Sequence, residues 1–397
     1  MSVSTAVVLA AGEGTRLRPL TRNRPKPMLP AANRPILESV FDALVDAGVE
    51  RIVVVVGYKR DRVQDHFGPS YRDVPLAYVR QDKQLGSGHA LLQARHAVEG
   101  PVLVVNGDRV IDAGIVTDVV DAFETGGGVP TLAVLERQNA RQYGAVVLHD
   151  REIAKIVEKP DTDDYRLING GVYAFDADIF DAIEETPRRD GELALTDTIA
   201  RLVHRGRVRG VESEGLWVDA TYPWDLLTVA TEVLARGRVD QPARDERVWV
   251  DDAARVHEAA TLQAPVVVGP DCEVSPGAVV GPNVALGRNV TVGANATVRR
   301  SVLDADTRVD PASTLQDTVT GQDVHLGAGT VVPGGPADVR VGTSVFEDQR
   351  LGAVVADRVH AEGDVSLAPG TLVGPNAHLD TGVRVSGHVV EGAEVVR

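Results

Sequence analysis

The feature that most constrains the fold is an aliphatic residue that recurs at every sixth position in the C-terminal part of the chain. A first run comprises Val250, Val256, Leu262, Val268, Val274, Val280, Leu286, Val292 and Val298, and a second comprises Val355, Ala361, Leu367, Val373, Leu379 and Val385. A period of six fits neither an α-helix nor a simple alternating strand. It predicts a coil in which three short strands form each triangular turn and the aliphatic side chain points inward.

This part of the chain resembles the left-handed parallel β-helix proteins built from hexapeptide repeats. We predict such a β-helix over residues 248–397, after a polar linker at 237–247 that contains Pro242. Residues 327–350 break the period with Gly-Ala-Gly-Thr and Pro-Gly-Gly-Pro, which predicts a loop that projects from the coil.

The preceding residues, 1–236, alternate strand and helix patterns. The segments 5–11, 51–56 and 102–105 are near-continuous apolar runs, which are typical of strands buried on both faces. Residues 36–45 carry apolar side chains at helical spacing. The succession predicts an α/β, Rossmann-like domain with a mostly parallel sheet, whose ligands bind beyond the carboxyl ends of the strands.

The charge balance restricts the partners of the protein. With 57 acidic and 41 basic residues, the net charge of −16 disfavours nucleic acid or an anionic membrane as the main partner. The carboxylate-rich composition favours adaptation to high salt, as in halophilic organisms. The single cysteine, Cys272, excludes an intrachain disulfide, and the absence of a leader or transmembrane pattern predicts a cytoplasmic protein.

The N-terminal segment carries the pattern of a phosphate-binding loop. A strand at 5–9 leads into Gly12 and Gly14, and Arg16 and Lys26 follow. Glycines after a strand let backbone N–H groups approach a phosphate, and the two cations can neutralise it. The dinucleotide-binding fingerprint would need a third glycine where Leu17 stands, and the Gly-Lys-Ser/Thr of a P-loop is absent.

The string from Leu9 to Thr21, followed by Pro25-Lys26-Pro27, resembles the signature of the sugar-1-phosphate nucleotidylyltransferases, and the resemblance covers residues 3–235. It implies transfer of a nucleotidyl group from UTP or dTTP to glucose 1-phosphate or N-acetylglucosamine 1-phosphate, with release of pyrophosphate. Because the attacking phosphate is already an anion, this reaction depends on positioning and electrostatics rather than on a general base.

The resemblance also implies roles for individual residues. Arg16 would stabilise the departing pyrophosphate, Lys26 would lie near the α-phosphate, and Lys159 would bind the sugar phosphate. Asp108 and Asp219 would hold Mg²⁺, an ion that prefers oxygen ligands. Gln81 and Gly86 would recognise the base. The implied nucleotide-binding set is Leu9, Ala11, Gly12, Gly14, Thr15, Gln81 and Gly86, and the implied sugar-binding set is Tyr143, Gly144, Glu158 and Asn169.

The layout of the whole chain resembles archaeal bifunctional nucleotidylyltransferase/acetyltransferase proteins, in which the β-helix would acetylate glucosamine 1-phosphate from acetyl-CoA. This sequence departs from that pattern, because Ser313 stands where the catalytic histidine of the family is expected, and Val332-Pro-Gly-Gly-Pro stands where an asparagine is expected. We expect His257, His325 and His360 to be exposed rather than catalytic.

We therefore expect the β-helix to mediate homo-oligomerisation, for which a trimer is common among such coils, or to bind an effector. A bifunctional enzyme is one alternative. A non-catalytic regulatory subunit is another, and the intact set of Arg16, Lys26, Asp108, Lys159 and Asp219 argues against it.

Overall fold

A computed structural model describes the chain except for residues 1–2, 138–139, 141–142, 159, 161 and 163. Its contacts divide the chain into two compact units. We call them the sheet unit (Met1–Glu13, Pro25–Met28 and Ile36–Trp217) and the coil unit (Gly14–Arg24, Leu29–Pro35 and Val218–Arg397). These units do not coincide with the limits expected from the sequence, because two short N-terminal segments and residues 218–236 group with the coil. The domain limits at residues 236 and 248 therefore stay a prediction.

The sheet unit contains a ten-stranded mixed sheet in the order β10-β11-β13-β9-β12-β7-β1-β4-β6-β5. The expected parallel arrangement holds for β7, β1, β4 and β6, whereas β12 runs antiparallel between β7 and β9. Only two residues separate β10 from β11, so these strands pair antiparallel, because a parallel pair requires a longer crossover. The strands are β1 (Thr5–Ala10), β4 (Arg51–Val56), β5 (Ser70–Tyr71), β6 (Val74–Arg80), β7 (Val102–Asn106), β9 (Thr131–Glu136), β10 (Gly144–His149), β11 (Glu152–Glu158), β12 (Leu167–Phe175) and β13 (Arg209–Glu212).

Helices cover both faces of this sheet, and alternate strand residues face the two layers. Ala6 and Val8 of β1 belong to the apolar cluster that contains α1 and α4, whereas Val7 belongs to the cluster that contains α3, α5 and α6. Burial on both faces explains why the strands are continuous apolar runs. The other elements of this unit are α1 (Ile36–Asp46), α2 (Arg60–Phe67), α3 (Ser87–Gln93), α4 (Ala113–Thr125), α5 (Ile179–Glu184), α6 (Leu195–Arg205), β8 (Arg109–Ile111), η3 (Lys26–Met28) and η4 (Arg95–Ala97).

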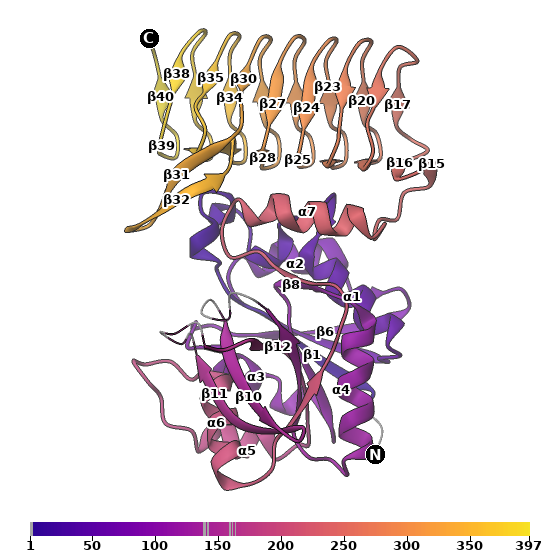
Figure 1. Cartoon of the computed structure of the whole chain (residues 1–397), viewed down its shortest axis with the longest axis vertical. Coiled ribbons are helices and arrows are strands. Elements are labelled where there is room, and N and C mark those ends of the chain that lie inside the picture. Colours follow the sequence, from indigo (N-terminus) through magenta and orange to yellow (C-terminus); the bar gives the residue numbers. More distant parts are fainter. Residues whose placement is uncertain (1–2, 138–139, 141–142, 159, 161, 163) are drawn as a thin grey trace. The chain divides into compact units, whose positions relative to one another are not determined.

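The coil unit contains the expected left-handed β-helix, in which three parallel sheets run along the coil axis (Figure 1). One sheet has β16 (Val248–Val250), β19 (Val266–Val268), β22 (Val284–Leu286), β25 (Ser301–Leu303), β28 (Thr318–Thr320), β33 (Ala353–Val355), β36 (Thr371–Val373) and β39 (His388–Val389). The second has β17 (Arg255–Val256), β20 (Glu273–Val274), β23 (Thr291–Val292), β26 (Arg308–Val309), β29 (His325–Leu326), β34 (His360–Ala361), β37 (His378–Leu379) and β40 (Glu394–Val395). The third has β18 (Thr261–Leu262), β21 (Val279–Val280), β24 (Thr297–Arg299), β27 (Thr314–Gln316), β30 (Val331–Val332), β35 (Ser366–Leu367) and β38 (Arg384–Val385).

The residues of the six-residue period line the interior of the coil, as predicted. Val268, Val280, Leu286 and Val373 are fully buried, and only Val256 and Leu262 in the first turn are partly exposed. The coil also continues between the two runs, through inward residues that the strict period misses: Leu303, Val309, Leu315, Leu326 and Val332. Three six-residue repeats would place paired residues 18 positions apart. One corner in each of these turns lacks a residue, so Leu286 pairs with Leu303, which is 17 positions on.

The interruption of the coil is shorter than residues 327–350. Residues 331–332 form β30 and stay in the coil, and the projecting part is the antiparallel hairpin β31 (Pro336–Val341) and β32 (Ser344–Arg350). Phe346 of this hairpin packs its ring against Tyr222 and Trp224. An aromatic contact therefore secures the hairpin within the coil unit.

The rest of the coil unit consists of short elements. They are η1 (Thr15–Leu17), η2 (Leu20–Arg22), β2 (Pro30–Ala31), β3 (Arg34–Pro35), α7 (Asp225–Ala235) and β15 (Ala243–Asp245), while β14 (Trp217–Asp219) crosses the limit between the units. The predicted linker is thus partly ordered as β15, which pairs antiparallel with β16. Among the described residues, no helix is both long enough and apolar enough to span a bilayer.

Candidate active site

A lysine and an aspartate form an ion pair beyond the carboxyl end of β7. The Nζ atom of Lys26 lies 2.8 Å from Oδ2 of Asp108, and the lysine side chain is only 12% exposed. Gly107 permits this geometry, because its N–H donates to the carbonyl oxygen of Leu9 and a Cβ there would lie 2.9 Å from the side chain of Val8. The sheet edge thus presents one cation and one carboxylate side by side, where ligands of parallel strands bind.

The loop after β1 is open at its glycine. A Cβ added to Gly12 would meet nothing within 4 Å, so no neighbouring atom crowds the backbone there. The loop is fixed from below, because the carbonyl oxygen of Ala11 accepts a hydrogen bond from the N–H of Tyr58. A Cβ at Gly57 would lie 2.8 Å from that same oxygen, which explains the glycine after β4.

Gln81 is buried, and its amide orientation is determined by its neighbours. The amide nitrogen donates to the carbonyl oxygen of Gly86 at 3.1 Å and lies 2.9 Å from Nδ1 of His89. Burial lowers the pKa of His89, and the charge of Arg188 lowers it further, which favours a neutral ring that accepts this hydrogen bond. Because the nitrogen faces these two acceptors, the amide oxygen is the atom left to accept from a base.

The expected sugar-binding residues converge on one another. A Cβ at Gly144 would lie 3.3 Å from a carboxylate oxygen of Glu158 and 3.5 Å from Cβ of Asn169. The amide nitrogen of Asn169 donates to the Tyr173 hydroxyl, and its amide oxygen accepts from the N–H of Gly171. We therefore expect Asn169 to shape this region mainly through the protein rather than by direct contact with a sugar.

Trp217 organises this region and was not singled out from the sequence. The ring of Tyr143 packs edge-on at 5.1 Å, and the guanidinium groups of Arg109 and Arg137 lie 4.9 and 5.2 Å from the ring centroid. The indole nitrogen donates to the carbonyl oxygen of Gly170. Arg109 directly follows Asp108, and Trp217 lies two residues before Asp219. Their closeness to these predicted metal ligands is the sequence signal that could have pointed to them.

Four of the expected residues belong to the coil unit. Gly14 has φ +69° and precedes η1, where its carbonyl oxygen accepts from the Thr21 hydroxyl at 2.8 Å. Thr15 and Arg16 are exposed, and Oδ2 of Asp219 accepts from the hydroxyl of Thr221 at 2.8 Å. That these residues join Lys26 and Asp108 in one site stays a prediction, and Lys159 lies outside the described residues.

The β-helix histidines are less exposed than expected. His257 is exposed, but His325 and His360 are half-buried, so the expectation of exposure is wrong for these two. Nε2 of His325 lies 2.9 Å from Oδ2 of Asp310, and the ring borders a cavity of 340 Å³ that Arg308, Arg358, Asp306 and Asp323 also line. Ser313, where the sequence lacks the expected histidine, is buried and donates to the carbonyl oxygen of Gly327.

Comparison with known proteins defines the class to which the chain belongs. Residues 5–236 match the nucleotidyl transferase family, and residues 262–368 match the family described as the GMPPB C-terminal domain. The chain belongs to the nucleotidyl transferase family and is a sugar-1-phosphate nucleotidyltransferase with a C-terminal β-helix.

Its full length is similar to the bifunctional protein GlmU of Methanococcus maripaludis, with 30% identity over 415 residues and 98% of each chain covered. Its N-terminal part is similar to the UTP–glucose-1-phosphate uridylyltransferase AglF of Haloferax volcanii, with 37% identity over 55% of this chain and 92% of that protein. Among solved structures, a putative glucose-1-phosphate thymidylyltransferase from Bacillus anthracis has 26% identity and a TM-score of 0.55, and the match covers 60% of this chain and 97% of that one.

Proposed function

We propose that the N-terminal part of this enzyme transfers a uridylyl group from UTP to N-acetylglucosamine 1-phosphate or glucose 1-phosphate. A phosphate oxygen of the sugar attacks the α-phosphorus, the bond between the α-phosphorus and its bridging oxygen breaks, and pyrophosphate leaves. The observation that carries this proposal is the Lys26–Asp108 pair at the sheet edge. It supplies the cation and the carboxylate that a magnesium-dependent reaction between two anions requires.

The donor chemistry of the expected metal ligands fits Mg²⁺. Asp108 and Asp219 offer carboxylate oxygens, and both side chains are only partly buried, so that bound water and phosphate oxygens could complete the coordination. Mg²⁺ held there would offset the negative charge of the phosphate groups. Lys26 would then exchange its contact with Asp108 for one with the α-phosphate, and Arg16, which is exposed, would neutralise the pyrophosphate.

The choice of base follows from the orientation of Gln81. Its amide oxygen can accept from the N3–H of uracil or thymine, whereas the corresponding atom of cytosine has no proton to donate. The relative named as a UTP-dependent uridylyltransferase supports UTP as the first choice, and dTTP is the alternative that the assay must compare.

Pyrophosphate release with the four common ribonucleoside triphosphates and dTTP, each sugar phosphate and Mg²⁺ tests the proposal. We expect turnover with UTP, and a loss of kcat/KM of about 10²–10³ for Lys26→Ala, the size seen when one charge-stabilising donor is removed. Arg51→Ala is the matched control, because Arg51 is exposed at the opposite end of the same sheet. No pyrophosphate release with any pair, or full activity of Lys26→Ala, would contradict the proposal.

A second function is favoured by the full-length similarity to a protein named as bifunctional. We propose that the β-helix also acetylates glucosamine 1-phosphate from acetyl-CoA, and that the reaction occurs in the cavity beside His325. The amine attacks the thioester carbonyl, its proton passes to His325, and coenzyme A leaves as the thiolate. Asp310 orients the His325 ring, and Arg308 and Arg358 supply positive charge for phosphate groups.

Release of free thiol from acetyl-CoA in the presence of glucosamine 1-phosphate tests this second function. We expect His325→Ala to abolish it and His257→Ala, which removes an exposed histidine, to leave it unchanged. Absence of thiol release from the unmodified protein would restrict the β-helix to assembly or effector binding. Light scattering of the same samples tests the predicted homo-oligomer.

A further inference from the structure

Three histidines occupy consecutive rungs on the outer face of one β-helix sheet. His325, His360 and His378 pair in register on β29, β34 and β37, and the neighbouring inward residues, Leu326, Ala361 and Leu379, are fully buried. The rings of His360 and His378 stack at 5.2 Å with an interplanar angle of 3°. The ladder thus holds its imidazole rings in a fixed order, one rung apart.

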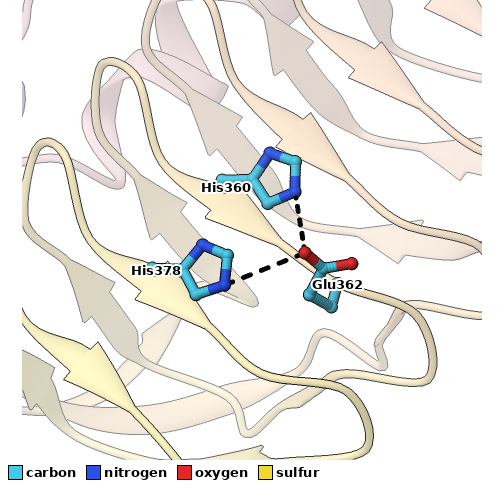
Figure 2. A group of neighbouring side chains, drawn as sticks. All are labelled: His360, Glu362 and His378. Atoms are coloured by element: carbon cyan, nitrogen blue, oxygen red, sulfur yellow. Dashed lines mark hydrogen bonds and ion pairs between the residues drawn. The ribbon is translucent and has the colours of Figure 1, made fainter.

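Carboxylates lie beside this ladder. Oε1 of Glu362 lies 3.2 Å from Nε2 of His360 and 3.8 Å from Nε2 of His378, as Figure 2 shows. Oδ1 of Asp380 lies 3.5 Å from Nε2 of His378. Glu362 directly follows β34 and lies two residues after His360, which brings its carboxylate beside that ring.

The ladder and its carboxylates form one continuous row of contacts. From Asp310 to Glu362 there are three contacts in succession: Asp310 to Nε2 of His325, Nδ1 of His325 to Nδ1 of His360 at 3.2 Å, and Nε2 of His360 to Glu362. The row therefore links the ladder to Asp310 at one end and to Glu362 at the other.

We propose that His360, Glu362 and His378 bind a divalent transition-metal ion such as Zn²⁺. Their ligand atoms lie within 4.8 Å of one another, so modest side-chain rotations bring them to one ion. Two imidazoles and a carboxylate are a common donor set for zinc and leave positions open for water. With an ion on Nε2 of His360, Nδ1 of the same ring keeps its contact with His325, whose Nε2 contacts Asp310.

This outer arrangement matches how metal-binding histidines are usually held. A ligating imidazole typically donates its other N–H to a carboxylate, a backbone carbonyl or a water. Here the second contact runs from His360 through His325 to Asp310. The same position on earlier rungs is taken by Arg308, Thr291 and Glu273, so the histidines occupy the rung of Glu362 and the two rungs beside it.

Calorimetric titration of chelator-treated protein with Zn²⁺ tests the proposal. Millimolar Mg²⁺ in the buffer and an Asp108→Asn background keep the N-terminal carboxylates from contributing. We expect one ion per chain, with affinity at least 30-fold weaker in Glu362→Gln and in His378→Ala. His257→Ala, which removes an exposed histidine directly after β17, should bind as the unmodified protein does.

Two further measurements keep the test decisive. Circular dichroism spectra and melting curves show whether the variants are folded, and a Zn²⁺-dependent rise in the melting temperature should vanish in Glu362→Gln. Co²⁺ in place of Zn²⁺ should give a visible absorption band that Glu362→Gln and His378→Ala lose. No binding at 100-fold excess of Zn²⁺, or equal binding by the unmodified protein and both variants, would overturn the proposal. None of these readouts depends on nucleotidyl or acetyl transfer.

Discussion

A buried arginine connects the N-terminal loop to the β-helix within the coil unit. The Arg24 side chain is 5% exposed and pairs with Asp304, after β25, and with Asp357, after β33, at 3.2 Å. Burial by itself lowers the pKa of Arg24, but the charges of the two carboxylates more than offset this and raise it. Gly321, which follows β28, leaves room for the Asp357 carboxylate, because a Cβ at this position would clash with it.

Replacing Arg24 by methionine should destabilise the coil unit strongly. The change leaves two buried carboxylates without their cation, and breaking a buried ion pair from one side costs about 3–5 kcal/mol. For a unit of this size, each kcal/mol lowers the melting temperature by a few degrees, so the expected fall is on the order of 10 °C. Thermal unfolding followed by circular dichroism measures it.

Two comparisons decide whether the buried charge is the cause. Arg384→Met, at an exposed position of β38 in the same unit, should shift the melting temperature by no more than about 2 °C, because exposed substitutions generally cost under about 0.5 kcal/mol. The triple variant Arg24→Met, Asp304→Asn, Asp357→Asn should recover most of the loss, since no unpaired charge remains buried. An equal effect of Arg24→Met and Arg384→Met, or a triple variant no better than the single one, would refute this reasoning.

Two more predictions concern positions with little tolerance. Gly86→Ala should destabilise the sheet unit by more than about 1 kcal/mol and weaken nucleotide binding, because Gly86 has φ +95° and a Cβ would lie 2.6 Å from the carbonyl oxygen of Leu193. Urea unfolding and the KM for UTP measure the two effects. No change in either would show that the backbone around Gly86 shifts to accept a side chain. The Cys272 thiol should not react with a thiol reagent at pH 8 until the protein is unfolded, because burial raises its pKa to about 12 and keeps it protonated well above that pH; rapid reaction of the native protein would contradict this burial.

Much of the β-helix was readable from the sequence because its repeat maps directly onto structure. Each sixth residue points inward, so Leu286 and Val373 could be assigned to the core without knowledge of any distant contact. The same rule missed Leu303 and Leu326, because corners shortened by one residue shift the register while the parallel pairing continues. It also set the projecting segment too wide, since β30 returns to the coil before the hairpin begins.

The candidate site was readable only in part. Asp108 and Lys26 stand in motifs whose residues are close along the chain, and the structure brings them together at 2.8 Å. Trp217 and His89 were missed, because each acts through neighbours that the fold supplies: the rings and guanidinium groups around Trp217, and the Gln81 amide beside His89.

Short-range patterns in the chain were enough to predict the two kinds of architecture and the type of chemistry: a period of six, apolar strand runs, and a glycine loop with cations. Which polar groups share a proton or a charge is visible only in the folded chain. The burial of Arg24 between Asp304 and Asp357, and the contacts that link Asp310, His325 and His360, arise from residues 15 to more than 300 positions apart. Such contacts depend on how the coils align, and no local pattern in the chain records that alignment.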